Sequence, residues 1–313
     1  MGRMHALVTG GAGFIGSHLA ERLVREGWQV RVLDNFSTGR RDNLSTFAGK
    51  IDVIEGDVAD AATCRRACQG VEVVLHQAAI PSVPKSVADP LTSHRVNVDG
   101  VLHMLAAARD GGVKRFVYAS SSSVYGESEV LPKVESMPPS PLSPYAVQKL
   151  TGEYYCRVFA HCYGLATIAL RYFNVFGPRQ DPASQYAAAI PAFITSLLRG
   201  ERPTVYGDGL QTRDFTSIEN VVQANLLAVS ADGVAGQVVN IGAGGCVTVN
   251  DIITQIGKLL DAEAKPRHVD ARQGDIRHSW ADIGEARRVL RYEPAVSLSD
   301  GLARTVAWYQ ENG

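Results

Sequence analysis

The sequence predicts an α/β protein whose larger part is a doubly wound parallel sheet and whose smaller part is a mixed α/β C-terminal lobe. Short β-branched runs alternate with helix-period stretches through the first 180 residues, and these stretches are long enough for right-handed crossover helices. After Phe173 the alternation loosens, and prolines and glycines separate shorter elements. The strands that we expect lie at residues 5–9, 29–34, 52–55, 71–76, 115–120 and 167–172.

The composition restricts the class of protein. The chain has 313 residues, of which 45% are hydrophobic and 20% charged, as is typical of a folded globular protein. A formal net charge of −1 provides no broad basic field, so we expect no nucleic-acid partner. The first residues do not resemble a secretion signal, and no apolar run reaches about 18 residues, so we expect a cytoplasmic protein with no membrane partner. The five cysteines lack paired spacing, which predicts free thiols and no metal site.

A glycine-rich loop follows the first expected strand. Gly10, Gly13 and Gly16 are spaced by three and lead into an amphipathic helix. This spacing permits a tight turn, close approach of a pyrophosphate and close packing of the helix on the strand. The helix N-terminus also offers free N–H groups to a phosphate. An ordinary βα turn would explain the loop alone, but Asp34 ends the next strand at the spacing expected of a ribose-binding acid. Together they predict a dinucleotide site.

Asp34 favours NAD over NADP. A carboxylate accepts hydrogen bonds from both ribose hydroxyls and repels an additional phosphate. Arg40 and Arg41 lie nearby and leave NADP open as the alternative. Asp57 and Val58 follow the third expected strand and suit the rim of an adenine pocket, although an ordinary loop acid would give the same pattern.

Tyr145 and Lys149 stand one turn apart on an expected helix that Ser143 can cap and Pro144 can begin. A phenol is a poor base at neutral pH, but a neighbouring ammonium and a positive nicotinamide ring would stabilise its phenolate. Such a pair is common on helix surfaces and needs a third partner to indicate catalysis. The serines that follow the strand at 115–120 stand at the expected ligand-binding edge, although serines also simply end strands.

In their order along the chain, these motifs resemble the extended short-chain dehydrogenase/reductase family, and particularly its nucleotide-sugar 4-epimerases. The resemblance covers nearly the whole chain. It implies that Ser121, Tyr145 and Lys149 are catalytic. Its pieces are TGGAGFIG at 9–16, Asp34-Asn35, Gly56-Asp57-Val58, His76-Gln77-Ala78-Ala79, Asn97, SSSSVYG at 120–126, Tyr145-x-x-x-Lys149 and Arg171-Tyr172-Phe173-Asn174.

The resemblance also implies the residues that bind cofactor and substrate. Arg213 and Arg272 resemble diphosphate-binding arginines, a task that suits the fixed fork of guanidinium donors, and Tyr206 resembles an aromatic group beside uracil. Pro81 stands where several hexose epimerases have a lysine, so one phosphate contact departs from the pattern. The implied NAD contacts are Gly10, Gly13, Phe14, Ile15, Gly16, Asp34, Asn35, Asp57, Val58, Gln77, Ala78, Ala79, Asn97, Tyr145, Lys149 and Phe173. The implied UDP-sugar contacts are Ser122, Ser123, Asn174, Tyr206, Arg213, Arg272 and Ser279.

The implied reaction is reversible epimerisation at carbon 4 of a UDP-sugar through a transient 4-keto sugar. Related 4,6-dehydratases have Thr-Asp-Glu where this chain has Ser121, Ser122 and Ser123, so the carboxylates for eliminating water are missing. Ser123 also weighs against a UDP-glucuronate decarboxylase, which tends to need a glutamate there. A UDP-glucose 4-epimerase proper, a UDP-glucuronate 4-epimerase or decarboxylase, a 4,6-dehydratase and a non-catalytic NAD sensor stay as alternatives.

The resemblance further bears on the sugar. Enzymes restricted to glucose and galactose tend to have a tyrosine in place of Ser279, and a small residue leaves room for an acetamido group. The run GPRQDP at 177–182 also resembles epimerases that prefer acetamido sugars. We therefore expect UDP-N-acetylglucosamine and UDP-N-acetylgalactosamine as preferred substrates, with weaker activity on UDP-glucose and UDP-galactose.

Two expectations concern organisation. The change of pattern predicts an NAD-binding domain at 1–175 and a mainly nucleotide-sugar-binding lobe at 176–313, with the chain returning in part to the first domain. The helices that we expect to begin near Asn97 and Pro144 could pair across a two-fold axis, which predicts a homodimer. Packing within the core would explain the same apolar stripes.

Overall fold

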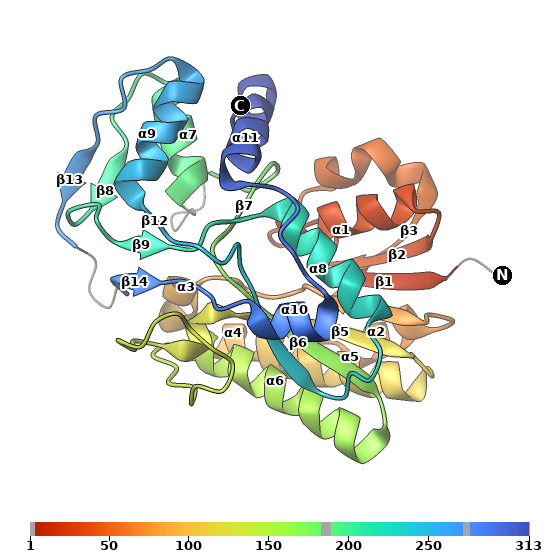
Figure 1. The fold of residues 1–313 in the computed structure, drawn as a ribbon. Coiled ribbons are helices and arrows are strands. Elements are labelled where there is room, and N and C mark those ends of the chain that lie inside the picture. Colours follow the sequence, from red (N-terminus) through yellow and green to blue (C-terminus); the bar gives the residue numbers. More distant parts are fainter. Residues whose placement is uncertain (1–3, 183–188, 272–275, 313) are drawn as a thin grey trace.

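A computed structural model of the chain describes residues 4–182, 189–271 and 276–312. Its centre is a seven-stranded sheet in which every strand pairs in parallel with its neighbours, in the order β11-β6-β5-β4-β1-β2-β3 (Figure 1). The predicted fold class is therefore confirmed, and each of the six expected strands is present with ends within two residues of those predicted. The strands are His5–Thr9 (β1), Gln29–Asp34 (β2), Ile51–Glu55 (β3), Val73–His76 (β4), Arg115–Ser121 (β5), Ala166–Tyr172 (β6) and Gln237–Ile241 (β11).

The strand order reverses direction between β1 and β4. From β1 the chain adds β2 and β3 on one side, and it then crosses to add β4, β5 and β6 on the other side. In an open parallel sheet, this switch point leaves a crevice beyond the carboxyl ends of the strands, where ligands bind. The glycine loop, Gln77 and the serines after β5 all follow strands at this edge.

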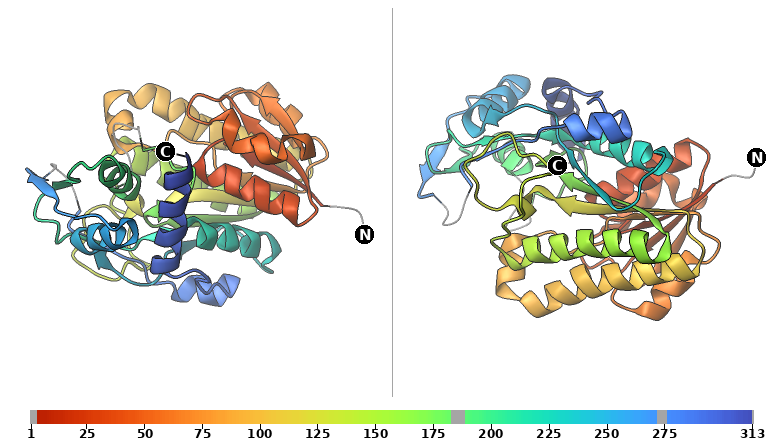
Figure 2. Two further views of the ribbon diagram at one scale, coloured as in Figure 1. Left: turned by 90° about the horizontal axis from the view of Figure 1, so that it is seen from above. Right: turned by 60° about the horizontal axis from the view of Figure 1, so that its bottom comes forward.

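Helices cover both faces of the sheet, so its inner strands are buried on both sides and consist of nearly continuous apolar runs, whereas the edge strand β3 is largely exposed. One face packs Leu19 and Leu23 of α1 and Val221 of α8 against the sheet, and the other packs Met104 of α5 and Cys156 of α6 against it (Figure 1). Figure 2 shows α5 and α6 side by side on that second face. The helices of the two layers are α1 (Phe14–Arg25), α2 (Ala61–Cys68), α5 (Gly100–Asp110), α6 (Pro144–Tyr163), α8 (Ile218–Ser230) and α10 (Gly284–Leu290), with a 3-10 segment, η1 (Arg41–Lys50).

A smaller lobe lies beyond the carboxyl edge of the sheet (Figure 1). Its three helices enclose a separate apolar cluster that includes Ile194, Ile252 and Leu302. Short strands complete it as a mixed α/β unit. The elements are β7 (Val175–Phe176), α7 (Ala189–Leu198), β8 (Thr204–Tyr206), β9 (Thr212–Arg213), β10 (Thr216–Ser217), β12 (Val247–Thr248), α9 (Val249–Leu260), β13 (Arg267–Val269), β14 (His278–Ser279) and α11 (Leu298–Asn312).

The helix expected near Asn97 begins earlier than predicted. The side chain of Asp89 accepts a hydrogen bond from the Thr92 N–H at 3.0 Å, and Pro90 occupies the first helical position. The helix then passes through a π-helical turn, which contains Asn97, before it continues as α5. The remaining short segments are α3 (Val83–Ala88), α4 (Pro90–His94), η2 (Arg95–Asp99) and η3 (Ser122–Tyr125). Within the described parts of the chain, no helix has the length and apolar character needed to cross a membrane.

Candidate active site

The glycine loop forms a tight cradle between β1 and α1. Gly10 has φ of 65°, a conformation that glycine adopts without strain, and an added Cβ there would lie 2.8 Å from the backbone of Ala78. A Cβ on Gly16 would lie 2.1 Å from the Gly10 carbonyl oxygen. Gly13 precedes the helix and supplies no side chain to cap its N–H groups. Those donors, in a loop that side chains would fill, fit the pyrophosphate of a dinucleotide.

Asp34 ends β2 beside this loop and is only 8% exposed. Its two carboxylate oxygens accept hydrogen bonds from the N–H groups of Ala12 at 2.9 Å and Phe36 at 2.8 Å. Burial raises the pKa of Asp34, and these two hydrogen bonds oppose the rise. Arg41, one of the two arginines that kept NADP open, pairs with Glu55 at 2.6 Å and lies 3.9 Å over the ring of Phe36. This engagement weighs against a role for Arg41 in binding a second phosphate.

The other implied adenine-side residues follow β2 and β3. The Asn35 side chain donates to Asp57 at 3.2 Å, and Asp57 also accepts from the Ala59 N–H at 2.8 Å. Val58 is buried, and an added Cβ on Gly100 would lie 2.7 Å from its side chain. Asp57 is therefore ordered by its neighbours, while Val58 packs against the start of α5.

The segment after β4 is held from two directions. Gln77 bonds through its amide to Asn225 at 3.2 Å and through its carbonyl to the Tyr172 hydroxyl at 3.3 Å. Ala78 donates its N–H to the Thr9 hydroxyl at 3.2 Å. Ala79 follows directly and is partly buried. The structure thus brings residues 77–79 next to the end of β1, where the glycine loop begins.

Asn97 braces this same segment. It accepts the Ile80 N–H at 2.8 Å and donates to the Ile80 carbonyl at 3.2 Å and to Gln148 of α6 at 2.8 Å. Its side chain is almost fully buried. The contact joins the loop after β4 to the helix that carries Tyr145 and Lys149.

Ser121, Tyr145 and Lys149 meet at the carboxyl end of β5. Ser143 caps α6 by accepting the Ala146 N–H at 3.2 Å, so Tyr145 falls in the first turn and Lys149 one turn later. The Lys149 ammonium lies 5.8 Å from the centroid of the Tyr145 ring and donates to the Ala119 carbonyl at 2.8 Å. A side-chain hydrogen bond joins Tyr145 to Ser121.

Burial dominates the electrostatics of these residues. It raises the pKa of Tyr145 to about 12, against the hydrogen bond with Ser121, which lowers it. It lowers the pKa of Lys149 to about 8, against the neighbouring carboxylate of Glu153, which raises it. The expected stabilisation of the phenolate is therefore not produced by these side chains alone, because the buried ammonium bonds to a backbone carbonyl rather than to the phenol.

Phe173, an implied NAD contact, and Asn174, an implied substrate residue, lie where β6 ends. Phe173 is fully buried, with its ring 6.2 Å from that of Tyr125. Asn174 has φ of 25°, and its side chain donates to the Asp214 carbonyl at 3.3 Å. Asn174 therefore turns towards the second lobe at the point where the chain leaves the sheet.

The other implied substrate residues come from short segments. Ser122 and Ser123 form the start of η3, and the Ser123 hydroxyl oxygen is buried without a hydrogen-bond partner among the described residues. Arg213 of β9 and Ser279 of β14 are register partners, so the structure brings them together. Tyr206 ends β8 in a different two-stranded sheet and is 37% exposed. Arg272 lies outside the described residues.

A buried polar cluster behind Ser121 was not assigned a role from sequence. Glu153 of α6 binds Arg171 of β6 through two hydrogen bonds of 2.8 and 2.7 Å, and Ser120 donates to the same carboxylate at 2.5 Å. The Arg171 guanidinium also lies 4.6 Å from the centroid of the Tyr125 ring. A signal existed, because a charged residue inside an apolar strand needs a buried partner, and Glu153 stands one turn after Lys149 on the same helix.

Asp214 is a second site residue that sequence reasoning missed. It is 1% exposed and accepts the N–H groups of Ala243, Gly244 and Ala281 at 2.7, 3.1 and 3.3 Å. Burial raises its pKa, and those backbone donors oppose the rise. Asp214 thereby binds the loop at 243–244 and the segment at 281 to its own position beside Arg213, and its local sequence carries no motif that predicts this.

Comparison with known proteins gives a consistent family. A family model described as the NAD dependent epimerase/dehydratase family matches residues 6–242. A UDP-glucose 4-epimerase of Mycolicibacterium smegmatis is 39% identical over 311 residues, which cover 98% of this chain and 99% of that protein. A dTDP-glucose 4,6-dehydratase of Streptomyces griseus is 37% identical over 98% of this chain and 94% of its own length.

A solved structure shows the same likeness in three dimensions. It is the UDP-N-acetylglucosamine 4-epimerase of Methanobrevibacter ruminantium in complex with UDP-N-acetylmuramic acid, with a TM-score of 0.95, 39% identity and full coverage of both chains. The predictions of an enzyme of the extended short-chain dehydrogenase/reductase type and of NAD as the family's cofactor are confirmed. From its sheet, its glycine cradle and these matches, the chain belongs to the NAD dependent epimerase/dehydratase family.

Proposed function

We propose that this protein catalyses the reversible NAD-dependent epimerisation of a UDP-sugar at carbon 4, with UDP-N-acetylglucosamine and UDP-N-acetylgalactosamine preferred over UDP-glucose and UDP-galactose. The observation that carries the proposal is the meeting of Ser121, Tyr145 and Lys149 at the carboxyl end of β5. The glycine loop and Asp34 lie along the same edge of the sheet. A bound oxidising cofactor and the proton acceptor Tyr145 would thus face one crevice.

The cofactor is assigned to the first part of the chain. The glycine loop would hold the pyrophosphate, Asp34 the adenosine ribose, and Lys149 the nicotinamide ribose. Bound there, NAD would supply reversible hydride transfer at carbon 4 of the sugar. We assign residues 1–175 mainly to this task and residues 176–313 mainly to the nucleotide sugar, although β11 of the later part completes the sheet.

The chain's own residues move and hold the proton. Tyr145 takes the proton of the 4-hydroxyl group, and Ser121 donates a hydrogen bond to the same sugar oxygen. The sugar is left as a 4-ketone, which turns within the site before Tyr145 returns the proton, so that configuration inverts without net redox change. Because burial holds the pKa of Tyr145 at about 12, its deprotonation needs added positive charge. The positive nicotinamide ring of bound NAD would add that charge to the charge of Lys149, whose pKa burial lowers to about 8.

The residues of η3 favour epimerisation over elimination or decarboxylation. Both alternative reactions need a carboxylate near the sugar, and positions 121–123 supply three hydroxyl groups instead. Ser123 directs a buried oxygen that is unpaired within the described chain, which suits a sugar hydroxyl as its partner. A 4,6-dehydratase therefore remains a weaker candidate even though one relative bears that name.

The preference for acetamido sugars rests on Ser279. Its small side chain lies on β14, partly buried and in register with Arg213 of β9, so a substituent at carbon 2 would meet a hydroxymethyl group rather than a ring. We expect Ser279→Tyr to lower turnover of UDP-N-acetylglucosamine relative to UDP-glucose. An unchanged ratio of the two activities would show that size at this position does not select the sugar.

We also propose a homodimer formed through α6. Val147, Tyr154 and Val158 are 49, 50 and 47% exposed, and their spacing of seven and four residues puts them on one face of the helix. Exposure on this chain's surface supports pairing with a second copy over packing within the core. Light scattering should give the mass of a dimer, and Val147→Lys with Val158→Lys should give a monomer.

The function is tested with purified protein, UDP-sugars and no added cofactor. We expect conversion of UDP-N-acetylglucosamine into its 4-epimer. Chromatography of the nucleotide sugars measures this conversion. Tyr145→Phe should reduce kcat roughly 10²- to 10⁴-fold, whereas Tyr163→Phe at the far end of the same helix should not. A lack of conversion for every UDP-hexose and UDP-N-acetylhexosamine would refute the proposal, and full activity of Tyr145→Phe would refute the mechanism.

A further inference from the structure

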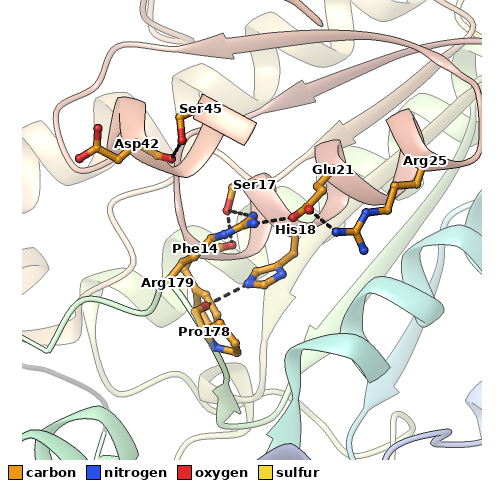
Figure 3. A network of polar contacts seen from close by, with 9 residues as sticks. All are labelled: Phe14, Ser17, His18, Glu21, Arg25, Asp42, Ser45, Pro178 and Arg179. Atoms are coloured by element: carbon orange, nitrogen blue, oxygen red, sulfur yellow. Dashed lines mark hydrogen bonds and ion pairs between the residues drawn. The ribbon is translucent and has the colours of Figure 1, made fainter. Parts of the chain in front are cut away.

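The segment that follows β7 lies across the cofactor-binding helix α1. Arg179 binds the carboxylate of Glu21 in a short ion pair and donates to the Ser17 hydroxyl at 3.4 Å. His18 donates from Nε2 to the Pro178 carbonyl at 3.0 Å. Figure 3 shows Arg179 and Pro178 against the first two turns of α1, with Ser17, His18 and Glu21 all turned towards them. Two parts of the chain about 160 positions apart are thereby joined.

The contacts are well shielded from solvent. The side chains of Arg179 and Glu21 are each 16% exposed, so solvent screens their attraction much less than that of a surface pair. Arg179 has φ of 65°, a backbone conformation that costs free energy for a residue other than glycine. The contacts of the Arg179 side chain must offset that cost. We call the set formed by Ser17, His18, Glu21, Pro178 and Arg179 the α1 clamp.

The clamp lies next to the end of α1 that the proposed function gives to the pyrophosphate. Gly177 begins the segment, and a Cβ added there would lie 2.4 Å from Ile218 of α8 and 3.5 Å from Phe14, the first residue of α1. On its other side, the Tyr309 hydroxyl of α11 donates to the Gln180 carbonyl. The segment is therefore fixed between the cofactor helix and helices of the later half of the chain.

We propose that Arg179 is a positioning residue whose clamp on α1 holds the segment 177–180 over the start of that helix and slows the release of NAD. The proposal rests on the proposed function, because an epimerase must return hydride from the same cofactor that accepted it. Loss of the cofactor between the two transfers would strand a 4-keto sugar. A contact that joins the substrate lobe to the cofactor helix opposes that loss.

The chain offers a matched control. Arg25 pairs with the same Glu21 carboxylate at 2.5 Å, but from within α1 and with 73% of its side chain exposed. Arg25→Gln therefore removes a positive charge from Glu21 without touching the segment 177–180. Arg179→Gln removes an equal charge and breaks the clamp. Any difference between the two variants reports the clamp rather than the charge of Glu21.

The experiment measures how fast the purified holoenzyme releases NAD. A dehydrogenase and its alcohol substrate, both in excess, reduce each NAD molecule that leaves, and absorbance of the NADH formed follows the release. Arg179→Gln and Glu21→Gln should release NAD roughly tenfold faster than the unaltered protein, as expected for loss of a shielded charged hydrogen bond. Arg179→Lys keeps the charge but not the forked donors of the guanidinium, so its release rate should lie between those of the unaltered protein and Arg179→Gln. Arg25→Gln should stay within about twofold of the unaltered protein.

Thermal unfolding of the same samples distinguishes an effect on NAD release from an effect on the stability of the fold. A merely structural contact would lower the unfolding temperature of Arg179→Gln and leave the release rate unchanged, and this result would overturn the clamp. Equal release from Arg179→Gln and Arg25→Gln would overturn it as well. If Arg179→Gln does not fold, Glu21→Gln breaks the same pair from the other side. Unaltered protein that carries no NAD would overturn the proposed function together with the clamp.

Discussion

The buried pair of Glu153 and Arg171 yields a quantitative prediction. Their side chains are 3% and 4% exposed, and the carboxylate accepts two hydrogen bonds from the guanidinium and one from Ser120. Glu153→Gln keeps the shape but leaves the Arg171 charge buried without a counter-charge. Breaking such a pair costs about 3–5 kcal/mol. For 313 residues, the entropy of unfolding at the midpoint is about 0.7 kcal/mol per degree, so Tm should fall by about 5–8 °C.

A surface pair of the same geometry is the control. Arg287 binds Glu293 through two hydrogen bonds of 2.7 and 3.1 Å, but the side chains are 54% and 66% exposed. Exposed pairs contribute about 0–1 kcal/mol, so Glu293→Gln should lower Tm by less than about 2 °C. Calorimetry at one scan rate gives both values. Equal shifts for Glu153→Gln and Glu293→Gln would refute the reasoning that burial sets the cost of losing the partner.

Three other predictions follow from single positions. Gly16→Ala should yield protein without NAD, since the added Cβ would lie 2.1 Å from a backbone carbonyl oxygen. Gly49→Ala should keep its NAD, because its added Cβ meets no described atom within 4 Å. Acid extraction and absorbance measure the NAD content of both variants. Burial lowers the pKa of Lys149 to about 8 from an ordinary value of 10.5, so the unfolded chain binds more protons between these limits and stability should rise with pH from about 8 to 9.5. The free energy of unfolding of Lys149→Met, measured by urea titration, should not rise over this pH range. The same dependence on pH in the variant and in the unaltered protein would contradict this prediction. Of the five cysteines, only Cys162 and Cys246 are exposed, so a thiol reagent should modify two groups quickly in the native protein and five after unfolding.

The sequence predicts six of the seven central strands because their signal is local. Each is a short β-branched run between helix-period stretches, and right-handed crossovers restrict the topology to a doubly wound one. The strand Gln237–Ile241 was not predicted. It comes after the alternation has loosened, and only its pairing with β6, far earlier in the chain, gives it a place in the sheet. Long-range pairing of this kind leaves no periodic trace in the segment itself.

The candidate active site also has one part that the sequence predicts and another that depends on tertiary packing. Ser121, Tyr145 and Lys149 were named from motifs, and the structure brings them together. Their charge states could not be predicted, because the pKa of Tyr145 depends on how completely α6 and β5 exclude water. The partner of Arg171 was missed for a related reason. A charge within a strand predicts that some partner exists, but only the packing of α6 on the sheet identifies Glu153.

β11 is synthesised well after β6, the strand with which it pairs, and this order has a consequence for folding during synthesis. On the ribosome, β6 is complete long before residues 237–241 emerge, so one edge of the nascent sheet stays unpaired while the second lobe begins to be made. An unpaired edge readily recruits foreign strands. Translation speed through residues 177–236 and chaperone access during that interval should therefore influence the yield of native enzyme more than changes near either terminus.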